Sequence, residues 1–348
     1  MSTDWDQLAT PLNAPADTPA QDIDPGPDDG GEAIPWKRVN IDFCARHNPP
    51  TRRFAIGKLP VPKETGVYGL LLGPDGTRKS WLALHIAMAM AKAGGQPVAG
   101  GLWPAPEPGR VVYVTTEDDV AELWERIHAI ARQPGWEWVG DLGHHLDILA
   151  VPQITLVTDS KNGPARGADC TRLIRYAKGA SLMVLDPLAD LADADDADAR
   201  ASRMIVQTLR HISRSVGAAV LVVHHQNKAA MLAGNTNHQS GRGNTRIGAG
   251  ARWAVVLQPM DREKAELEGI DIADRSRWTA VHESKASYAH LDAPQWFYHW
   301  PTTQERNGAV VGGVPLFRKL PSVGKTITKK ARAYAQASNG GIDDDDDY

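Results

Sequence analysis

Short apolar runs alternate along the chain with longer segments in which apolar residues recur at helical spacing. The runs predict strands at Gly66–Leu72, Arg110–Thr116, Asp147–Val151, Leu182–Asp186, Gly217–Val223, Trp253–Leu257, Trp278–Glu283 and Gln295–Trp300. The longer segments predict helices at Trp81–Lys92, Val120–Arg132, Cys170–Ala177 and Ala199–Val216. Thr158–Ala168 is predicted to be a polar loop, and Asp261–Asp274 to be a charged excursion from the sheet. This alternation predicts an α/β fold with a mostly parallel sheet.

The first predicted strand runs into a glycine-bearing loop that ends in Lys-Ser, and a helix follows at once. The loop residues are Gly73, Pro74, Asp75, Gly76, Thr77, Arg78, Lys79 and Ser80. In this context the loop and helix N–H groups point at an anion, Lys79 reaches the β- and γ-phosphates, and Ser80 ligates magnesium. The loop therefore predicts a nucleoside triphosphate site. The alternative is a chance turn or a decayed site.

Arg78 occupies the position where this type of loop usually has its second glycine. If the backbone there requires a positive φ, a residue other than glycine costs about 1–2 kcal/mol. If the position is already helical, Arg78 is tolerated and adds positive charge near the phosphates. The sequence leaves both alternatives open.

Acidic residues follow the second predicted strand, at the edge where parallel sheets bind their ligands. We expect Glu117 to be the general base that activates water, on a strand beside the P-loop strand. Asp118 and Asp119 are expected to cap the helix that follows, and capping is also the alternative role for Glu117.

Another predicted strand, Leu182–Asp186, is closed by an aspartate. A buried strand that carries a carboxylate, downstream of a phosphate-binding loop, is the second signature of nucleoside triphosphatases. Asp186 is therefore predicted to act with Ser80 at a magnesium site.

Two histidines, His224 and His225, follow the predicted strand Gly217–Val223. A polar residue at that place can touch the γ-phosphate and signal its presence to the next loop. We expect His225, rather than His224, to be this sensor. The alternative is that both histidines cap the strand, and two histidines alone are too few for a metal site.

The segment His238–Arg252 is rich in glycine, basic, and free of acidic residues. It is either an ordinary mobile loop or a phosphate-binding segment. Arg242, Arg246 and Arg252 suit phosphate groups, either of DNA or of a nucleotide bound by a neighbouring subunit.

Composition limits the location and partners of the protein. The 348 residues carry a formal net charge of -4 with a pI near 6.3, which gives no general attraction to nucleic acid. Only Cys44 and Cys170 occur, which argues against a disulfide scaffold and fits a reducing compartment. The acidic N-terminus does not resemble a signal peptide, and the longest apolar stretch is too short to span a bilayer. We expect a cytoplasmic protein without membrane contact.

The two ends of the chain differ from its middle. Residues 1–40 are acidic and rich in Pro, Ala and Gly, so we expect a disordered arm before an ATPase domain at 41–300. Residues 301–332 form a basic extension, and residues 333–348 form a disordered tail that ends in Asp343–Tyr348. The tail is either merely solvated or a docking peptide for a replication protein.

Taken together, the motifs resemble the RecA-fold ATPases related to the RepA hexameric replicative helicases of plasmids, and more distantly the DnaB-type helicases. The resemblance covers Phe54 to Tyr288 and rests on G-P-D-G-T-R-K-S-W-L-A-L, V-V-Y-V-T-T-E-D-D, L-M-V-L-D-P-L-A-D-L, G-A-A-V-L-V-V-H-H-Q-N-K, R-G-N-T-R-I-G-A-G-A-R-W and K-A-S-Y. It implies a RecA-like P-loop NTPase fold, with a twisted sheet covered by helices on both faces.

The resemblance also implies ATP hydrolysis at the subunit interfaces of a ring. Lys79, Ser80 and Asp186 would hold Mg-ATP, Glu117 would activate water, and His225 would sense the γ-phosphate. A neighbouring subunit would supply a basic finger; Arg252 is the first candidate, followed by Lys285 and Arg242. The stretch after Lys285 lacks the second basic residue that DnaB-like proteins carry two places later. We expect no attached primase, zinc module or winged helix.

These features predict a DNA-dependent ATPase that forms a hexameric ring. We expect a replicative helicase of a phage or mobile element that moves along single-stranded DNA, with Arg242 and Arg246 binding the DNA and ATP and Mg²⁺ as cofactors. Such a protein would work in the host cytoplasm. One alternative is an accessory ATPase, such as a loader or recombination mediator. The other is a non-hydrolysing ATP-binding switch or scaffold with a degenerate P-loop.

Overall fold

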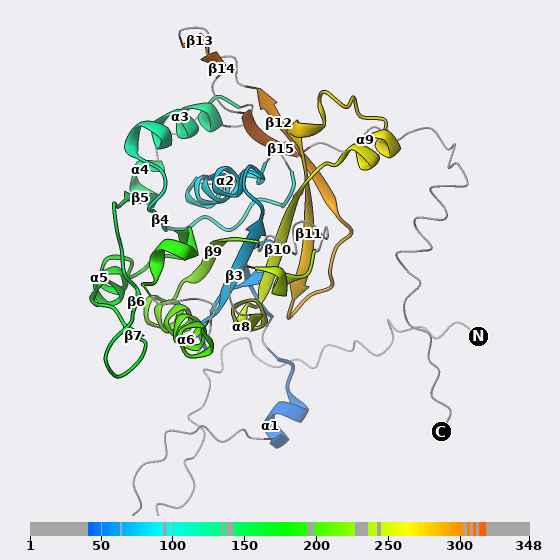
Figure 1. Ribbon diagram of the computed structural model, residues 1–348. Helices are drawn as coiled ribbons and strands as arrows, with labels where there is room; N and C mark the ends of the chain where they lie inside the picture. Colours follow the sequence, from blue (N-terminus) through cyan, green and yellow to red (C-terminus); the bar gives the residue numbers. More distant parts are fainter. Residues whose placement is uncertain are drawn as a thin grey trace, which may run out of the picture. The chain divides into compact units, whose positions relative to one another are not determined.

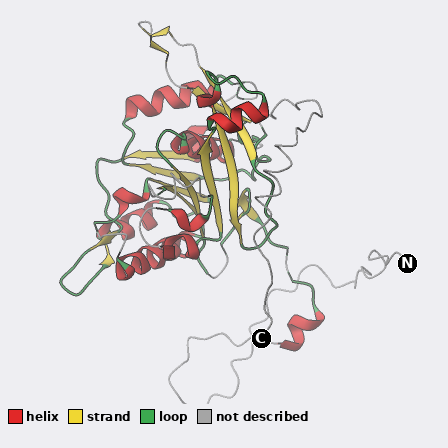
Figure 2. Cartoon of the chain, turned by 45° about the vertical axis from the view of Figure 1, so that its right-hand side comes forward, coloured by secondary structure: helices red, strands yellow, loops and turns green. Residues whose placement is uncertain are grey.

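The structure, a computed structural model, describes residues 41–49, 51–62, 65–92, 96–99, 101–133, 136, 142–193, 198–226, 236–241, 245–301, 305–306, 309–310 and 313–317. The chain divides into two units, residues 1–51 and residues 52–348. The first unit contains a short exposed helix, α1 (Ile41–Arg46). The second unit is built on a central sheet, which Figures 1 and 2 show from two directions.

Among the described residues, the central sheet has nine strands. In order across the sheet they are β15 (Gly313–Phe317), β12 (Gln295–Pro301), β11 (Trp278–Ala286), β10 (Trp253–Pro259), β3 (Tyr68–Gly73), β9 (Ala219–His225), β8 (Leu182–Asp186), β4 (Val111–Thr115) and β5 (Leu146–Ala150). All pairs from β10 to β5 are parallel. β11, β12 and β15 extend the sheet in antiparallel fashion beyond β10. The P-loop strand β3 therefore lies in the interior of the sheet.

Helices cover both faces of the parallel strands. One face carries α2 (Lys79–Ala91), α3 (Val120–Ala131) and α4 (Leu142–His145), and the other carries α5 (Ala168–Tyr176), α6 (Ala199–Val216) and α8 (Thr245–Gly250) (Figure 1). Successive strand residues enter opposite cores: Leu71 of β3 packs on the α2 side, and Leu70 and Leu72 pack on the α6 side. Because both faces are buried, the strands read as continuous apolar runs, and the predicted α/β fold class is confirmed.

Helix α6 shows why some boundaries could be predicted. It begins where the Asp198 side chain accepts hydrogen bonds from the N–H groups of Arg200 and Ala201, and it ends at Gly217, which adopts φ 80°. The predicted helix has the same bounds. An acidic N-cap residue and a glycine after the last helical residue can both be recognised in a sequence.

Two segments, one predicted as a loop and one left open between a loop and a phosphate-binding segment, contain regular structure. Part of Thr158–Ala168 forms a small hairpin, in which β6 (Val157–Thr158) pairs with β7 (Ala165–Arg166). The glycine-rich segment His238–Arg252 contains η3 (His238–Ser240) and α8, because Ile247 is buried in the core under α6. This segment is therefore not simply a loop.

Short elements complete the fold. They are β1 (Phe54–Ile56), β2 (Leu59–Pro60), η2 (Leu188–Leu191), α9 (Arg262–Glu268), η4 (Arg275–Arg277), β13 (Glu305–Arg306) and β14 (Ala309–Val310). Helix α9 lies in the segment predicted as a charged excursion, and it begins where the Asp261 side chain accepts a hydrogen bond from Lys264 N. The sheet also extends past residue 300, because β15 pairs with β12.

The position of β4 corrects one expectation. Glu117 was predicted to follow a strand next to the P-loop strand, but β9 and β8 lie between β4 and β3. Neighbours in an α/β sheet are set by the crossover connections, which the residues of a single strand do not encode.

Several predictions lie outside the described residues. They concern the acidic arm at 1–40, the tail at 333–348, and most of the basic extension at 301–332. Within the ranges that are described, none of the helices is long and apolar enough to cross a membrane.

The close approach of the loop before β3 to helix α6 gives a stability prediction. A Cβ atom on Gly66 would lie 1.8 Å from the carbonyl oxygen of Arg210 on α6. We expect Gly66→Ala to lower the free energy of unfolding by about 3 kcal/mol in urea titrations, because backbone must move. Gly179→Ala is the control: its φ is 84° but nothing lies within 4 Å, so we expect a loss of only about 1 kcal/mol. Equal losses in both variants would contradict this packing.

Candidate active site

Polar side chains gather where the parallel strands end at their carboxyl edge. β3 leads into the P-loop, β4 leads to Glu117, β8 ends in Asp186, and β9 ends in His225. The register aligns these ends, since Gly73 pairs with His225 and Thr115 pairs with Asp186. The sheet thus brings together residues from four segments that are far apart in the sequence.

The P-loop is closed by hydrogen bonds to one carbonyl. Pro74 O accepts from Thr77 Oγ1 at 2.7 Å and from Lys79 Nζ at 3.0 Å. Gly73 has no room for a side chain, because its Cβ would lie 2.7 Å from Thr77 Oγ1 and 2.8 Å from Leu257 O. The loop is therefore compact, and helix α2 starts directly from it.

The backbone at Arg78 answers the question that the sequence left open. Arg78 is the N-cap of α2 and adopts φ 62° and ψ 38°, in the left-handed region. Glycine reaches this conformation without steric cost, whereas a residue with a Cβ pays about 1–2 kcal/mol. Of the two alternatives, the strained one is correct.

Lys79 is a buried cation at the start of α2, with 6% of its surface exposed. Burial lowers its pKa, while the nearby carboxylates of Asp75, Asp186 and Glu117 oppose this effect. In the described part of the chain its ammonium group forms no ion pair and donates to Pro74 O. Such an ammonium group is placed to bind an anion.

Asp186 is the buried carboxylate of the site, with 1% of its surface exposed. Its Oδ2 accepts a hydrogen bond from the Tyr113 hydroxyl at 2.5 Å, whereas its buried Oδ1 has no hydrogen-bond partner among the described residues. Burial raises the pKa of Asp186 to about 6, although Tyr113 and Ser80 lower it in part. An unpartnered carboxylate oxygen beside a serine hydroxyl fits a magnesium ion, which prefers oxygen ligands.

His225 links the P-loop to the predicted base. Its Nδ1 lies 2.7 Å from Asp75 Oδ1, and its Nε2 lies 3.7 Å from Glu117 Oε1. The side chain of Glu117 is 48% exposed, so water reaches its carboxylate. The three side chains join the ends of β3, β4 and β9 across the site. The sequence indicated Glu117 and His225, but gave no sign of the contact with Asp75.

The two acidic residues after Glu117 have different roles. Asp119 caps α3, because its side chain accepts a hydrogen bond from Glu122 N at 2.9 Å. Asp118 does not cap the helix: its carboxylate forms an ion pair with Arg126 Nη1 at 2.6 Å, and burial raises its pKa. The capping prediction is therefore confirmed for Asp119 and wrong for Asp118.

Two of the three predicted finger residues, Arg252 and Lys285, lie at the opposite edge of the sheet, and the third, Arg242, is outside the described residues. Arg252 directly precedes β10, and its N–H donates to Tyr68 O at 2.9 Å, while Lys285 Nζ donates to Ala249 O at 2.6 Å. At about 3.3 Å per strand residue, Tyr68 and the P-loop are roughly 15 Å apart. Arg252 and Lys285 therefore do not join the P-loop of their own subunit.

Further cations surround these two. The Arg52 guanidinium lies 3.7 Å from the ring centre of Tyr288, Arg252 lies 5.7 Å from it, and Arg210 donates to Gly250 O. Among the described residues, none of these arginines forms an ion pair with a carboxylate. Lys285 likewise has no such partner there, and its pKa is lowered by burial and by the two charges of Arg252 and Arg210. Arg52 and Arg210 lie in no recognisable motif of the sequence, so nothing in the sequence pointed to them.

The residues predicted to contact DNA are only partly described. Arg246 is exposed on α8, beside the cationic edge, and Arg242 lies outside the described residues. Arg246 does not lie at the P-loop edge, because the neighbouring Ile247 O accepts a hydrogen bond from Tyr68, at the start of β3.

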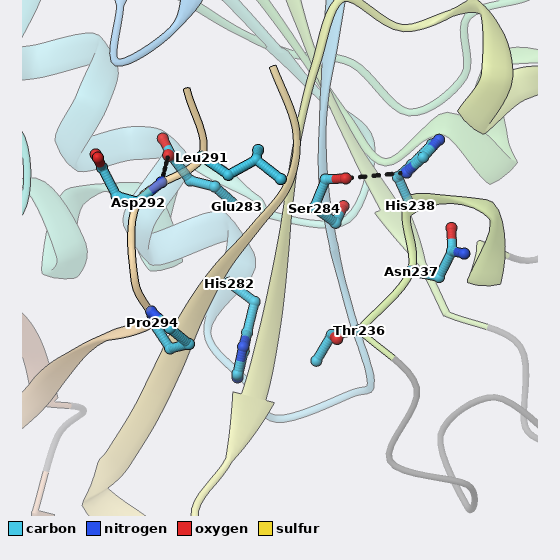
Figure 3. A pocket seen from close by; sticks show the side chains of 9 residues that line it. All are labelled: Thr236, Asn237, His238, His282, Glu283, Ser284, Leu291, Asp292 and Pro294. Carbon is cyan, nitrogen blue, oxygen red and sulfur yellow. Dashed lines mark hydrogen bonds between the residues drawn. The ribbon is translucent and has the colours of Figure 1, made fainter. Parts of the chain in front are cut away.

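A cavity of about 450 Å³ lies next to the part of β11 that β12 does not pair (Figure 3). Its lining residues are Thr236, Asn237, His238, His282, Glu283, Ser284, Leu291, Asp292 and Pro294. His238 Nδ1 lies 3.2 Å from Ser284 O, and Asp292 N donates to Glu283 Oε2 at 3.1 Å. Burial lowers the pKa of His238 and of His282, which disfavours their cationic forms. The described lining residues include two carboxylates and neither lysine nor arginine, so this cavity does not suit a triphosphate.

Comparison with solved structures gives similar folds at low identity. The RadB recombinase is 14% identical, with 68% of this chain and 88% of that chain covered and a TM-score of 0.42. A second solved structure, an ATPase domain, is 13% identical, with 67% and 81% covered and a TM-score of 0.45. A DnaB-like replicative helicase, solved in a study of its interactions with primase, is 13% identical, with 67% and 55% covered and a TM-score of 0.45.

The sequence itself matches a family model. The match to an AAA domain spans residues 40–231, which is more than half of the 348 residues, and it includes the P-loop, Glu117, Asp186 and His225. With its P-loop after an interior strand of a mostly parallel sheet, the fold is that of a RecA-like P-loop NTPase, as predicted. The chain belongs to the AAA domain family.

Proposed function

We propose that this protein is an ATP-hydrolysing, DNA-dependent motor, and that it works as a ring-forming helicase on single-stranded DNA. One observation carries the hydrolytic part of the proposal: Lys79, Asp186, Glu117 and His225 meet at one edge of the sheet, and His225 bridges Asp75 and Glu117. These side chains provide a cation, a metal ligand, a base and a polar contact for the terminal phosphate.

Each side chain has a chemical role in this proposal. Lys79 and the N–H groups of the α2 N-terminus bind the β- and γ-phosphates, and Ser80 and Asp186 hold the magnesium ion, which neutralises charge on the phosphate oxygens. Glu117 accepts the proton of the water that attacks the γ-phosphorus as the bond to ADP breaks. His225 contacts the γ-phosphate and links its presence to Asp75 and to the chain after β9.

The ring is supported by the cations at the other edge of the sheet. Arg252 and Lys285 have no carboxylate partner in the described part of the chain, and they lie too far from their own P-loop to act there. A neighbouring subunit stacked head to tail would present its P-loop to them. Arg246, and Arg242 from outside the described residues, would contact the phosphates of DNA.

Arg78 favours a second candidate function. A left-handed arginine in the P-loop adds strain at the position that contacts phosphate, which suits a switch that binds ATP and turns it over slowly. In that case Arg78→Gly would create hydrolysis that the native chain lacks. An accessory loader or mediator would instead show DNA-stimulated hydrolysis without strand displacement.

Steady-state hydrolysis tests the proposal. We expect single-stranded DNA to stimulate ATP turnover by the native protein, Lys79→Ala to lower turnover at least about 100-fold, and Glu117→Gln to lower it about 100- to 10,000-fold. Glu122→Gln, on the exposed face of α3, is the control and should retain turnover. Native turnover at the Lys79→Ala background, with and without DNA, would contradict the motor.

The raised pKa of Asp186 predicts a pH dependence of magnesium-nucleotide binding. Magnesium requires the ionised carboxylate, so affinity should fall up to about tenfold per pH unit below pH 6, where Asp186 becomes protonated. Fluorescent-nucleotide titrations from pH 5 to 8 measure this effect. In Asp186→Asn the phosphate groups of the nucleotide still titrate, whereas the pH dependence that ionisation of Asp186 adds to the binding affinity should be lost. The same pH profile in both proteins would exclude this role.

Mixing variants tests whether the finger acts between subunits. Arg252→Ala retains its P-loop and Lys79→Ala retains its finger, so each should be inactive alone. In rings formed from a 1:1 mixture, about one interface in four combines an intact P-loop with an intact finger. ATP turnover should therefore recover toward about a quarter of the native value. Arg200→Ala, on the exposed side of α6, should remain active alone. Absence of recovery in rings shown to contain both variants would assign Arg252 another role.

A further inference from the structure

Arg78 combines a left-handed backbone with a side chain that reaches away from the P-loop. Its backbone adopts the left-handed conformation that glycine would adopt without strain. Its guanidinium group is partly buried and donates from Nη1 to Ser276 O at 3.2 Å. Ser276 belongs to η4, in the connection between β10 and β11. The side chain therefore leaves the P-loop on the β10 side and reaches a separate segment of the chain.

The carbonyl that accepts from Arg78 belongs to the residue that precedes a second arginine, Arg277. Burial lowers the pKa of Arg78, and the positive charge of Arg277 lowers it further. Arg277 forms an ion pair with Asp274 at 3.3 Å. Arg78 has no ion pair with an acidic side chain in the part of the chain that the structure describes. The charge of Arg78 is thus not compensated there, and an anionic ligand would neutralise it.

The site has two distinct sides. Asp186, Glu117 and His225 lie on β8, β4 and β9, all on one side of β3, whereas β10 and η4 lie on the other side. The residues for magnesium, water and the γ-phosphate thus occupy the β9 side. A phosphate chain that starts at His225 and crosses the N-terminus of α2 would direct its nucleoside end toward β10.

We propose that Arg78 forms an additional anion-binding site for the α-phosphate at the nucleoside end of the nucleotide. This inference rests on the proposed function, because it assumes that the P-loop binds a nucleotide. The backbone strain at Arg78 is then the cost of placing a guanidinium group where glycine would place no side chain. The competing view is that Arg78 only fastens the P-loop to η4.

Variants at this position separate the side chain from the backbone. Arg78→Ala removes the guanidinium group and keeps the strained φ, whereas Arg78→Gly removes both. Arg78→Lys keeps a positive charge. Binding of ADP and of a non-hydrolysable ATP analogue, each with Mg²⁺, is measured by calorimetry on the full chain, and unfolding midpoints are recorded without nucleotide.

We expect Arg78→Ala and Arg78→Gly to weaken binding of both nucleotides by the same factor, about tenfold or more, because a charge-assisted hydrogen bond is lost. Arg78→Lys should recover part of the affinity. Arg78→Gly should also unfold at a higher temperature than Arg78→Ala. The common factor matters, because ADP and ATP share the α- and β-phosphates and differ only at the γ-phosphate, so an equal loss excludes a contact with the γ-phosphate.

Other outcomes overturn the inference. Unchanged affinity in Arg78→Ala would show that Arg78 does not contact the ligand, and a loss for the ATP analogue alone would place the side chain at the γ-phosphate. Recovery of native affinity in Arg78→Gly would show that only the loop conformation matters. These outcomes leave the proposed nucleotide site intact. Failure of the native chain to bind either nucleotide would overturn the proposed function as well.

Discussion

The site depends on two buried groups of opposite charge, the Lys79 ammonium group and the Asp186 carboxylate. Lys79 and Asp186 are held at the carboxyl edge of the sheet, where burial shifts both pKa values toward the neutral forms. Burial of charge is costly unless partners compensate for it. Here compensation is incomplete, since Lys79 donates to a carbonyl group and Asp186 Oδ1 has no partner among the described residues. A bound magnesium nucleotide would supply the missing partners: phosphate oxygens for Lys79 and the metal ion for Asp186 Oδ1.

The rest of the fold maintains this arrangement. Strands β3 and β8 are buried on both faces, so the two groups cannot move apart without disrupting the cores under α2 and α6. Tyr113, on the neighbouring strand β4, fixes one oxygen of Asp186 and leaves the other available. Closely packed strands therefore hold the two charges in place.

Charge is divided between the two edges of the same sheet. The carboxyl edge carries Asp75, Glu117 and Asp186 around one lysine, whereas the amino edge carries several cations around Tyr288. The two edges are separated by the length of the strands, so one chain cannot bring both to the same ligand. Head-to-tail association of identical subunits would satisfy both edges, which is why the proposed ring follows from the position of these residues in the sheet.

The sequence predicted the features that local patterns encode. The strands, the P-loop, Asp186 and the bounds of α6 follow from apolar periodicity and from caps. The strand order, the left-handed backbone of Arg78, the contact of His225 with Asp75 and the stacking of Arg52 on Tyr288 depend on long-range packing. No local pattern reports which crossover places two strands side by side, or which side chain meets a distant one.

The most direct test of the central claim is a crystal structure of the full chain with Mg²⁺ and a non-hydrolysable ATP analogue. We expect the β- and γ-phosphates to lie against Lys79 and the α2 N-terminus, with a metal ion held by Ser80 and Asp186. We also expect the γ-phosphate to lie on the His225 side of β3. A nucleotide bound elsewhere, for example in the cavity beside β11, or a P-loop that remains empty at saturating analogue, would contradict this claim.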